Sequence, residues 1–310
     1  MISVIIVNYN RKDLLRQCLD SLRSQSFKDI EIIVVDNASK DGSLDMLKDV
    51  YPEVKLIQNT DNLLFCRAQN QGVEASTGDF ILCLNNDVIL DRDYLKEMVF
   101  SAGLEDRIGM ISGKILRTGG KVIDSTGLFL GRNRKAVERG YGEIDNGRYD
   151  KPEFVFGVSG SCAFLRKGML LDLKDENGYF DERFGMYYED LDLCWRAQKK
   201  AWKAYYNPNA LAYHMRGGTA AGSNRKTWPV FHYIGRDLKK RYIVNRYRCI
   251  RKNDSFLGFL INLPFILFYE IKMYGYLALY LAFGFARTIF FERAKRAEKK
   301  KNLLDRNPYA

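Results

Sequence analysis

Two clusters of polar residues contain acidic side chains of the kind that group-transfer chemistry uses. The first is Asn85-Asn86-Asp87, which directly follows the apolar run 80–84. A carboxylate at a strand end can hold a divalent cation that bridges a diphosphate, so Asp87 is a candidate metal ligand. A strand that ends in Asn-Asn-Asp also makes a good turn, so this cluster alone is a weak signal.

The second acidic cluster is Glu189-Asp190, within the run Tyr187–Arg196. We expect these carboxylates at a helix N-terminus, where the helix dipole and free N–H groups stabilise their ionised form. The aromatic residues Tyr187 and Tyr188 suit the face of a sugar, and they equally suit a protein core. Simple N-terminal capping is the alternative explanation of the acidic pair.

His214 follows a predicted strand at 202–206 and is one of two histidines in the chain. Imidazole is a common metal ligand, although a lone histidine is often structural. No G-x-G-x-x-G follows the first apolar run and no G-x-x-x-x-G-K-[ST] occurs, which argues against a dinucleotide site and a P-loop. Residues 157–161 begin like the nucleophile elbow of a hydrolase but lack its final glycine.

The elements that must position these residues alternate in type along the first hundred residues. Fully apolar strands alternating with amphipathic helices predict an α/β fold with a mostly parallel central sheet, flanked by helices. A further helix is expected at 188–201, and Gly-rich strands and loops at 108–166. The apolar runs lie at 2–7, 30–35, 54–58 and 80–84, and the amphipathic segments at 11–24, 42–50 and 65–76.

Polar side chains gather where the four predicted strands end. The carboxyl ends of parallel strands meet at one edge of a sheet, where ligands bind in folds of this class. Asn and Asp also make turns, but four such ends on one edge favour a site for a polar ligand. The four ends are Asn8–Asn10, Asp36–Ser39, Asn59–Asn62 and Asn85–Asp87.

Composition and charge exclude several classes of protein. Of 310 residues, 46% are hydrophobic and 28% charged, which is typical of a globular chain and not of a disordered one. Six scattered cysteines without a C-x-x-C pair argue against a zinc ribbon and a disulfide framework.

Residues 225–310 hold 19 basic and 6 acidic residues, a net charge of +13, whereas residues 1–224 carry −2. Such a localised excess indicates one anionic partner surface, either a membrane or a nucleic acid. The apolar blocks that accompany it favour a membrane, so we expect no nucleic acid.

The C-terminal region predicts contact with a membrane. Two apolar blocks, 255–269 and 273–286, are interrupted by Glu270-Ile271-Lys272 and followed by Arg and Lys residues up to Lys301. Each block is shorter than the ~20 residues of a spanning helix, so two short interfacial helices are expected. A buried helical pair and a re-entrant or spanning hairpin are the alternatives. We therefore expect a catalytic domain over 1–224 and a membrane-associating region over 225–310.

The first residues lack the basic and small-residue features of a signal peptide. Together with the basic, apolar C-terminal region, this predicts a peripheral protein on the cytoplasmic face of a membrane, which the resemblance described next implies to be the bacterial inner membrane.

Taken together, these motifs resemble glycosyltransferase family 2, whose members have the GT-A fold. The resemblance covers residues 1–217 and is strongest for bacterial rhamnosyltransferase-like members, which have a similar tail. It is carried by an ordered set of segments: Val4–Arg11, Ile33–Ser43, Asn62–Gly72, Gly78–Asp87, Val158–Cys162, Gly178–Phe184 and Glu189–Cys194.

The resemblance implies an inverting glycosyltransferase. Such an enzyme moves a sugar, with rhamnose among the candidates, from a dTDP- or UDP-linked donor to a hydroxyl of a lipid-linked or cell-surface glycan. Asp190 would be the general base, and Glu189 and Gly160 would orient the acceptor. Asp87 and His214 would hold Mg²⁺ or Mn²⁺. The nucleotide-sugar pocket would be lined by Val7, Asn8, Asn10, Asp36, Asn37, Arg67, Asn70, Asn86 and Asp87.

The sequence departs from the family pattern in a few places. Asn85-Asn86-Asp87 has a single acid where Asp-x-Asp is usual, Leu64 replaces a common glycine, and Arg67 replaces a small residue. The Gln-x-x-Arg-Trp motif of processive synthases is missing, which favours transfer of one sugar per event. A nucleotidyltransferase and a non-catalytic sugar-nucleotide or membrane scaffold are the remaining alternatives.

Overall fold

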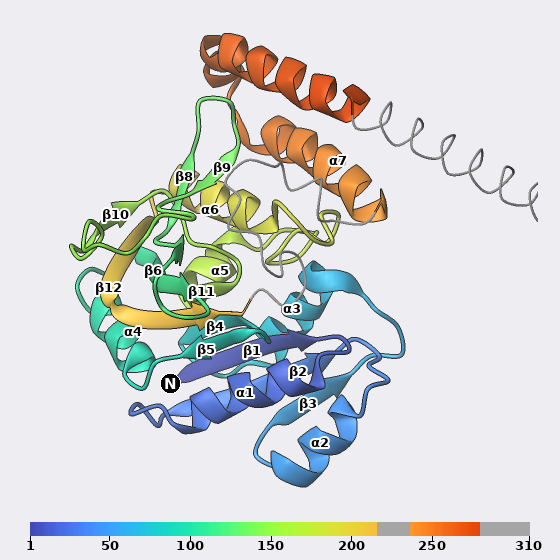
Figure 1. Ribbon diagram of the computed structural model, residues 1–310, viewed down its shortest axis with the longest axis vertical. Coiled ribbons are helices and arrows are strands. Elements are labelled where there is room, and N and C mark those ends of the chain that lie inside the picture. The colour runs from blue at the N-terminus through green and yellow to red at the C-terminus, as the bar shows by residue number, and fades with distance from the viewer. Residues whose placement is uncertain (216–235, 280–310) are drawn as a thin grey trace, which may run out of the picture. The chain divides into compact units, whose positions relative to one another are not determined.

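The computed structural model describes residues 1–215 and 236–279, and Figure 1 shows their elements. The chain divides into two compact units: Met1–Gly131 with Lys135–Asp254, and Arg132–Arg134 with the chain from Ser255 on. The boundary expected between residues 224 and 225 lies outside the described residues. Helix α7 (Arg236–Asn253), inside the expected C-terminal region, belongs to the first unit.

A ten-stranded sheet forms the centre of the first unit, with its main path in the order β10-β12-β6-β11-β4-β1-β2-β3. Strands β3, β2, β1, β4, β6 and β12 run in one direction, whereas β11 and β10 run in the other. The expected mostly parallel sheet is thus confirmed. The strands are β1 (Ile2–Asn8), β2 (Ile30–Asp36), β3 (Lys55–Gln58), β4 (Phe80–Asn85), β5 (Val88–Leu90), β6 (Ile108–Arg117), β7 (Ile123–Ser125), β10 (Glu153–Val155), β11 (Cys162–Arg166) and β12 (Lys203–His214).

Helices cover both faces of this sheet, because successive side chains of a strand point to opposite sides. Val4 and Ile6 of β1 belong to a core shared with α1, α2 and α4, whereas Ile5 belongs to a core shared with α3, α5, α6 and α7. The helices that complete the two layers are α1 (Lys12–Arg23), α2 (Ser43–Val50), α3 (Leu64–Ala75), α4 (Tyr94–Ala102), α5 (Lys167–Leu173) and α6 (Glu189–Lys199).

The elements expected in the first hundred residues are all present as β1 to β4 and α1 to α3, and α6 lies within the helix expected at 188–201. Helices α4 and α5 were not anticipated. Strand β12 continues past the expected strand at 202–206 to His214, because it pairs with β6 and then with β5. A short hairpin of β8 (Leu128–Leu130) and β9 (Ala136–Glu138) forms a separate two-stranded sheet.

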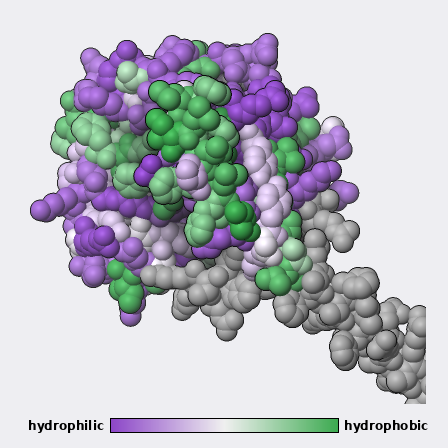
Figure 2. Space-filling view, turned by 90° about the horizontal axis from the view of Figure 1, so that it is seen from above, coloured by the Kyte–Doolittle hydropathy of each residue, from purple (hydrophilic) through white to green (hydrophobic). Residues whose placement is uncertain are grey.

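In the second unit, a single 24-residue helix, Phe256–Leu279, runs through the expected interruption. The expectation of two short helices is therefore wrong here, because Glu270 and Lys272 are good helix formers and do not break a helix. By length and composition this helix can cross a membrane, and only 11% of its most apolar window is buried. Hydrophobic residues gather on the face seen in Figure 2, and on this helix Phe256 and Ile271 are 80% and 71% exposed. Residues 280–286 and the basic run to Lys301 lie outside the described residues.

Candidate active site

At the carboxyl ends of β1, β2 and β4, amide and carboxylate side chains form one hydrogen-bonded cluster. The Asn8 amide donates to Asp36 Oδ2 at 2.9 Å, and the Asn86 amide donates to Asn8 Oδ1 at 2.9 Å. The other Asp36 oxygen accepts the backbone N–H of Ser39 at 2.8 Å. The parallel register that pairs Asn8 with Asp36 brings these buried groups together. We call the ends of these strands, with the loops that follow them, the strand-end edge.

The loops after β1 and β2 lie against each other at the strand-end edge. Ser39 Oγ accepts the N–H of Asn10 at 2.9 Å, and Asn10 Oδ1 accepts the N–H of Lys40 at 2.7 Å. Asn10 is exposed and has a φ of 52°, a left-handed conformation that Asn tolerates better than most residues. Asn37 is buried and accepts the side-chain amide of Asn59 at 2.9 Å. The expected polar edge is thus built from several strand ends.

Three other residues expected in the nucleotide-sugar pocket have different surroundings. Val7 is half-buried near the end of β1, and Arg67 is exposed on α3. Asn70 exchanges two hydrogen bonds of 2.9 Å with the backbone of Phe180, so its side chain ties α3 to the loop before α6. This engagement explains why asparagine suits position 70 without any ligand.

Asp87, His214 and Asp124 form a line of charged groups at the same edge. His214 Nε2 lies 3.2 Å from Asp87 Oδ1, and His214 Nδ1 lies 2.8 Å from Asp124 Oδ2. Burial lowers the pKa of His214, but the hydrogen bonds and charges of Asp124 and Asp87 outweigh this and raise it to about 9. Strand β12 positions the histidine, since His214 pairs with Val88 next to Asp87.

The donor set at Asp87 and His214 fits a divalent cation once the imidazole has released the proton that the two carboxylates stabilise, because a metal binds only neutral imidazole. A carboxylate and an imidazole nitrogen face each other, and Asp124 holds the second ring nitrogen, an arrangement usual behind a metal-bound histidine. Among the described residues, no group of three His, Cys, Asp or Glu side chains could enclose an ion. Two protein ligands suit Mg²⁺ or Mn²⁺, which commonly take their remaining ligands from water and substrate phosphates.

Asp190 lies in the first turn of α6 and faces Gly160 in the loop before β11. Its Oδ1 accepts the N–H of Leu191 at 2.7 Å, and its Oδ2 accepts the N–H of Gly160 at 3.3 Å. Burial raises the pKa of Asp190, and the two backbone donors oppose that rise. A side chain at position 160 would begin 3.3 Å from Asp190 Cβ, so glycine permits this close approach.

Two further carboxyl groups lie near Asp190. Glu189 is 8% exposed, and its Oε2 has no hydrogen-bond partner among the described residues. Burial and the charge of Asp190 raise the pKa of Glu189 to about 8. Glu138 of β9 accepts hydrogen bonds from Ser125 and Ser159, and burial, with a contribution from Asp190, raises its pKa to about 7. We call Asp190, Glu189 and Glu138 the carboxyl pocket.

Helix α7 fixes the loop that leads into the carboxyl pocket. The side-chain amide of buried Asn245 donates to the carbonyls of Phe184, Met186 and Tyr187 at 2.8, 3.0 and 2.9 Å. This loop needs such support, because Tyr187 and Tyr188 both have left-handed φ values, of 70° and 72°. The first unit therefore depends on α7 for the shape of its site.

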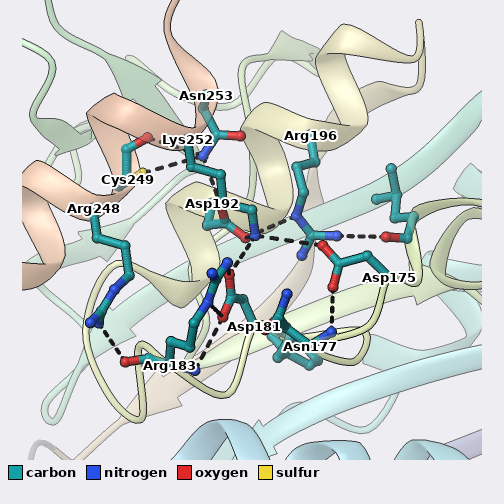
Figure 3. A network of polar contacts seen from close by, with 12 residues as sticks. Asp175, Asn177, Asp181, Arg183, Asp192, Arg196, Arg248, Cys249, Lys252 and Asn253 are labelled. Atoms are coloured by element: carbon teal, nitrogen blue, oxygen red, sulfur yellow. Dashed lines mark hydrogen bonds and ion pairs between the residues drawn. The ribbon is translucent and has the colours of Figure 1, made fainter.

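A charged network joins α7 to α6 behind this loop (Figure 3). Asp192 accepts hydrogen bonds from Arg196, Lys252 and Asn253 at 2.9, 3.1 and 2.8 Å. Lys252 also donates to Asp181 at 2.7 Å. Because Asp192 is fully buried, these donors compensate a carboxylate that would otherwise be costly to bury. The third acid of the Glu189–Asp192 run is thus structural.

Sequence reasoning missed Asp124, Glu138 and Asn245. Asp124 and Glu138 belong to three-residue strands in the Gly-rich region, where no periodic pattern exists. Asn245 lies in a helix whose outer face is strongly basic, and its role depends on a loop about 60 residues earlier. Only a buried polar residue within an otherwise charged helix could have signalled it.

The fold and this site define a GT-A glycosyltransferase architecture. A crystal structure of GalNAc-T7 with UDP, GalNAc and Mn²⁺ superposes with a TM-score of 0.61 and 14% identity, over 81% of this chain and 48% of that one. This likeness concerns the fold alone.

The chain belongs to glycosyl transferase family 2, whose sequence profile matches residues 3–173. The N-acetylglucosaminyl-diphospho-decaprenol L-rhamnosyltransferase of Mycobacterium tuberculosis is 25% identical over 70% of this chain and 76% of that protein. The amylovoran biosynthesis glycosyltransferase AmsB of Erwinia amylovora is 29% identical over 72% of both chains. A Bacillus subtilis relative is 34% identical over 108 residues, and the chain spans 31% of its length.

Proposed function

We propose that this protein is an inverting glycosyltransferase that moves a sugar from a nucleoside diphosphate to a hydroxyl of a lipid-linked or cell-surface glycan. The observation that carries the proposal is Asp190, a partly buried carboxylate at a helix start. It is held by backbone N–H groups and belongs to the same unit as a polar strand-end edge. Membership of glycosyl transferase family 2 supports the same reaction class.

The strand-end edge would bind the nucleotide. Asp36, held by Asn8 and the Ser39 N–H, would accept the N3–H of a pyrimidine, and the exposed Asn10 would lie at the rim. A pyrimidine fits both a UDP- and a dTDP-linked donor. Arg67, exposed on α3, is free to turn toward the diphosphate, whereas Asn70 would shape the pocket through its contact with Phe180.

Asp190 would act as the general base. Its carboxylate would take the proton of the acceptor hydroxyl as the oxygen attacks the anomeric carbon in line with the departing diphosphate. One base suffices for inversion, because the leaving diphosphate needs charge compensation and no proton. Burial of Asp190 raises its proton affinity, which favours this role. Glu189 and Gly160 would orient the acceptor and the base.

Asp87 and His214 would hold Mg²⁺ or Mn²⁺, with Asp124 fixing the imidazole. A bound cation would offset the charge that develops on the leaving diphosphate.

The relatives support a role in cell-envelope polysaccharide synthesis with rhamnose as one candidate sugar. The Mycobacterium protein is named for rhamnosyl transfer to a decaprenol-linked acceptor and the Erwinia protein for amylovoran biosynthesis. We propose a lipid-linked acceptor for this chain on the same basis, and this choice agrees with an exposed apolar helix in the second unit.

The Phe256–Leu279 helix would attach the protein to the cytoplasmic face of the inner membrane as a peripheral protein. It is long enough to span a bilayer, but Glu270 and Lys272 would then lie within the hydrocarbon, each at a cost of roughly 3 kcal/mol. A helix lying in the interface avoids this cost, because its charges stay at the headgroup level.

The test is sugar transfer by Asp190→Asn from a panel of UDP- and dTDP-sugars. We expect the fold and donor binding to be retained while turnover falls roughly a hundredfold or more, the scale of general-base loss. Asp106→Asn, at an exposed position of the first unit, is the matched control. Near-normal transfer by Asp190→Asn contradicts the assignment. A wild-type chain that binds donors without transferring or hydrolysing them is a scaffold and not an enzyme.

A further inference from the structure

A hollow of about 570 Å³ is lined by one face of α7 and by a residue of the loop between α5 and α6. Four of its six lining residues are basic and none is acidic. None of the residues proposed for the donor, the cation or the base lines it. The six residues are Arg183, Val244, Tyr247, Arg248, Arg251 and Lys252.

Carboxylates compensate only part of this positive charge. Arg183 and Lys252 both donate to Asp181, at 2.6 and 2.7 Å (Figure 3). Arg248 donates to two neutral oxygens, the Arg183 carbonyl and Asn245 Oδ1. Arg251 is exposed and makes no ion pair within the part of the chain that the structure describes. The guanidinium groups of Arg248 and Arg251 are therefore not paired with a carboxylate among the described residues and can bind an external anion.

The hollow lies on the solvent side of α7. Asn245 and Cys249 are buried on the side that packs against the α6 region, whereas Val244 and Tyr247 are 44% and 38% exposed. Cationic groups beside an exposed aliphatic and an exposed aromatic residue suit a ligand with a phosphate and an apolar part. Tyrosine is also enriched where proteins meet the headgroup layer of a membrane.

Chain connectivity keeps this hollow close to the apolar helix. Phe256, where the helix begins, follows Arg251 by five positions. An extended chain covers at most about 3.6 Å per residue, so the two Cα atoms lie within ~18 Å of each other. This limit holds for any arrangement of the two units. A helix lying in the headgroup layer therefore permits Arg251 to reach phospholipid phosphates.

We propose that this hollow binds the headgroup of an anionic phospholipid, with Arg248 and Arg251 on its phosphate and Val244 and Tyr247 beside its glycerol and acyl part. The proposal rests on the membrane association inferred above and adds a specific site to it. Guanidinium groups suit this ligand, because they donate charge-assisted hydrogen bonds to phosphate oxygens in a fixed geometry.

The test is flotation of the full chain with phosphatidylcholine vesicles, prepared with and without phosphatidylglycerol. The variant Arg248→Gln/Arg251→Gln should bind the anionic vesicles roughly 30-fold more weakly, since each basic residue near such a surface contributes about a factor of five. Its binding to neutral vesicles should not change. Arg92→Gln/Lys96→Gln removes the same charge from exposed positions at and before α4 and should stay within about twofold of the wild type. Arg251→Gln alone breaks no hydrogen bond or ion pair among the described residues, so it guards against misfolding of the double variant, and its binding should fall about fivefold.

Three results overturn the proposed site while the membrane association stands. They are equal binding of the wild type to both vesicles, an equal loss in the control variant, and release by inorganic phosphate but not by chloride at matched ionic strength. The last result would identify a site for small anions. A wild-type chain that floats with neither vesicle refutes the membrane association itself.

Discussion

The strand-end edge and the carboxyl pocket differ in the hydrogen bonding of one acid in each, Asp36 and Glu189. At the strand-end edge, both oxygens of Asp36 accept N–H donors, from Asn8 and Ser39. In the carboxyl pocket, Glu189 Oε2 has no partner within the described residues, and burial and the charge of Asp190 raise the pKa of Glu189 to about 8. Asp36, bonded once at each oxygen, keeps its position without a ligand, and its remaining lone pairs can accept a ligand's N–H. Glu189, buried with one oxygen unbonded, keeps a capacity to hold a proton. The first property suits binding, and the second suits a group that holds a proton beside the proposed base Asp190.

The two regions also differ in what holds them in place. The strand-end edge follows from the parallel register of β1, β2 and β4. The carboxyl pocket is assembled from the start of α6, from β9 and from a loop that α7 supports through Asn245. We therefore expect substitutions at the strand-end edge to act locally, and substitutions in the supports of the carboxyl pocket to act on stability as well.

The largest effect is expected at the charged line of the strand-end edge. Asp87→Asn should lower transfer roughly a hundredfold or more, because it removes a proposed ligand of the cation that offsets leaving-group charge. Asp124→Asn, which changes the partner of His214 Nδ1 and of Arg117 and not a proposed metal ligand, should lower transfer about 10- to 100-fold. Transfer rates measured across a Mn²⁺ titration distinguish the two variants. Excess metal should partly restore the activity of Asp124→Asn and not that of Asp87→Asn. Full wild-type activity in excess EDTA contradicts a metal role for Asp87.

Removing the support of the carboxyl pocket should have the next largest effect. Asn245→Ala leaves three carbonyls without their donor and should lower the free energy of unfolding by about 2 kcal/mol. Asn245→Asp should be worse, because its carboxylate would face carbonyl oxygens. Urea denaturation gives the stability and initial rates give turnover. If both variants match the wild type in the two measurements, the loop does not depend on α7.

A smaller effect is expected when the nucleotide contact is altered. Asp36→Asn replaces an acceptor of two N–H groups with an amide, and the donor KM should rise about tenfold, the scale of one or two lost hydrogen bonds. Turnover at saturating donor should change little, because Asp36 would contact the base of the nucleotide and not the reacting atoms. A fall in kcat with an unchanged KM would show that Asp36 acts in the chemical step and not in nucleotide binding.

The smallest effect concerns the pH dependence of stability. Glu189 has a pKa raised from 4.5 to about 8, so its folded form holds a proton that the unfolded chain releases above pH 4.5. This contribution to stability is complete below pH 4.5 and is lost as the pH rises to about 8. Glu189→Gln needs no proton, so its Tm relative to the wild type should rise as the pH increases through this range and then level off.

Thermal melts of both proteins between these pH values test this expectation. Glu176→Gln, which removes an exposed glutamate, is the matched control. A Tm difference that stays constant with pH means that Glu189 titrates alike in the folded and unfolded chains.

The parts of the molecule that could be predicted from the sequence are those set by local patterns. The apolar runs predicted β1 to β4, and the polar residues after them predicted that Asn8, Asp36 and Asn86 lie at one edge of the sheet, where they form hydrogen bonds. Glu189-Asp190 was correctly placed at the start of a helix. Each of these inferences needs only residue periodicity and the rule that parallel strands end on one edge.

The remaining parts depend on contacts between distant segments. Glu138 enters the carboxyl pocket because Ser125 and Ser159, from two other segments, hold its carboxyl group. Asn245 acts on a loop about 60 residues earlier in the chain. The continuous Phe256–Leu279 helix was missed because two charged residues resemble a break, although backbone propensity decides the matter. Sequence periodicity does not show which hydrogen-bond donors a buried acid will contact.

The place of β11 in the sheet has a consequence for how the chain must be made. β11 (Cys162–Arg166) lies between β4 and β6, so the edges of β4 and β6 that face it stay unpaired until residue 166 has left the ribosome. Until then, two hydrophobic edges are available for pairing with other chains. Fragments that stop earlier already contain the whole strand-end edge from Asn8 to Asp87, yet we expect them to aggregate before they can bind a nucleotide. During synthesis, the proposed binding residues are therefore present well before β11 covers the open edges of β4 and β6.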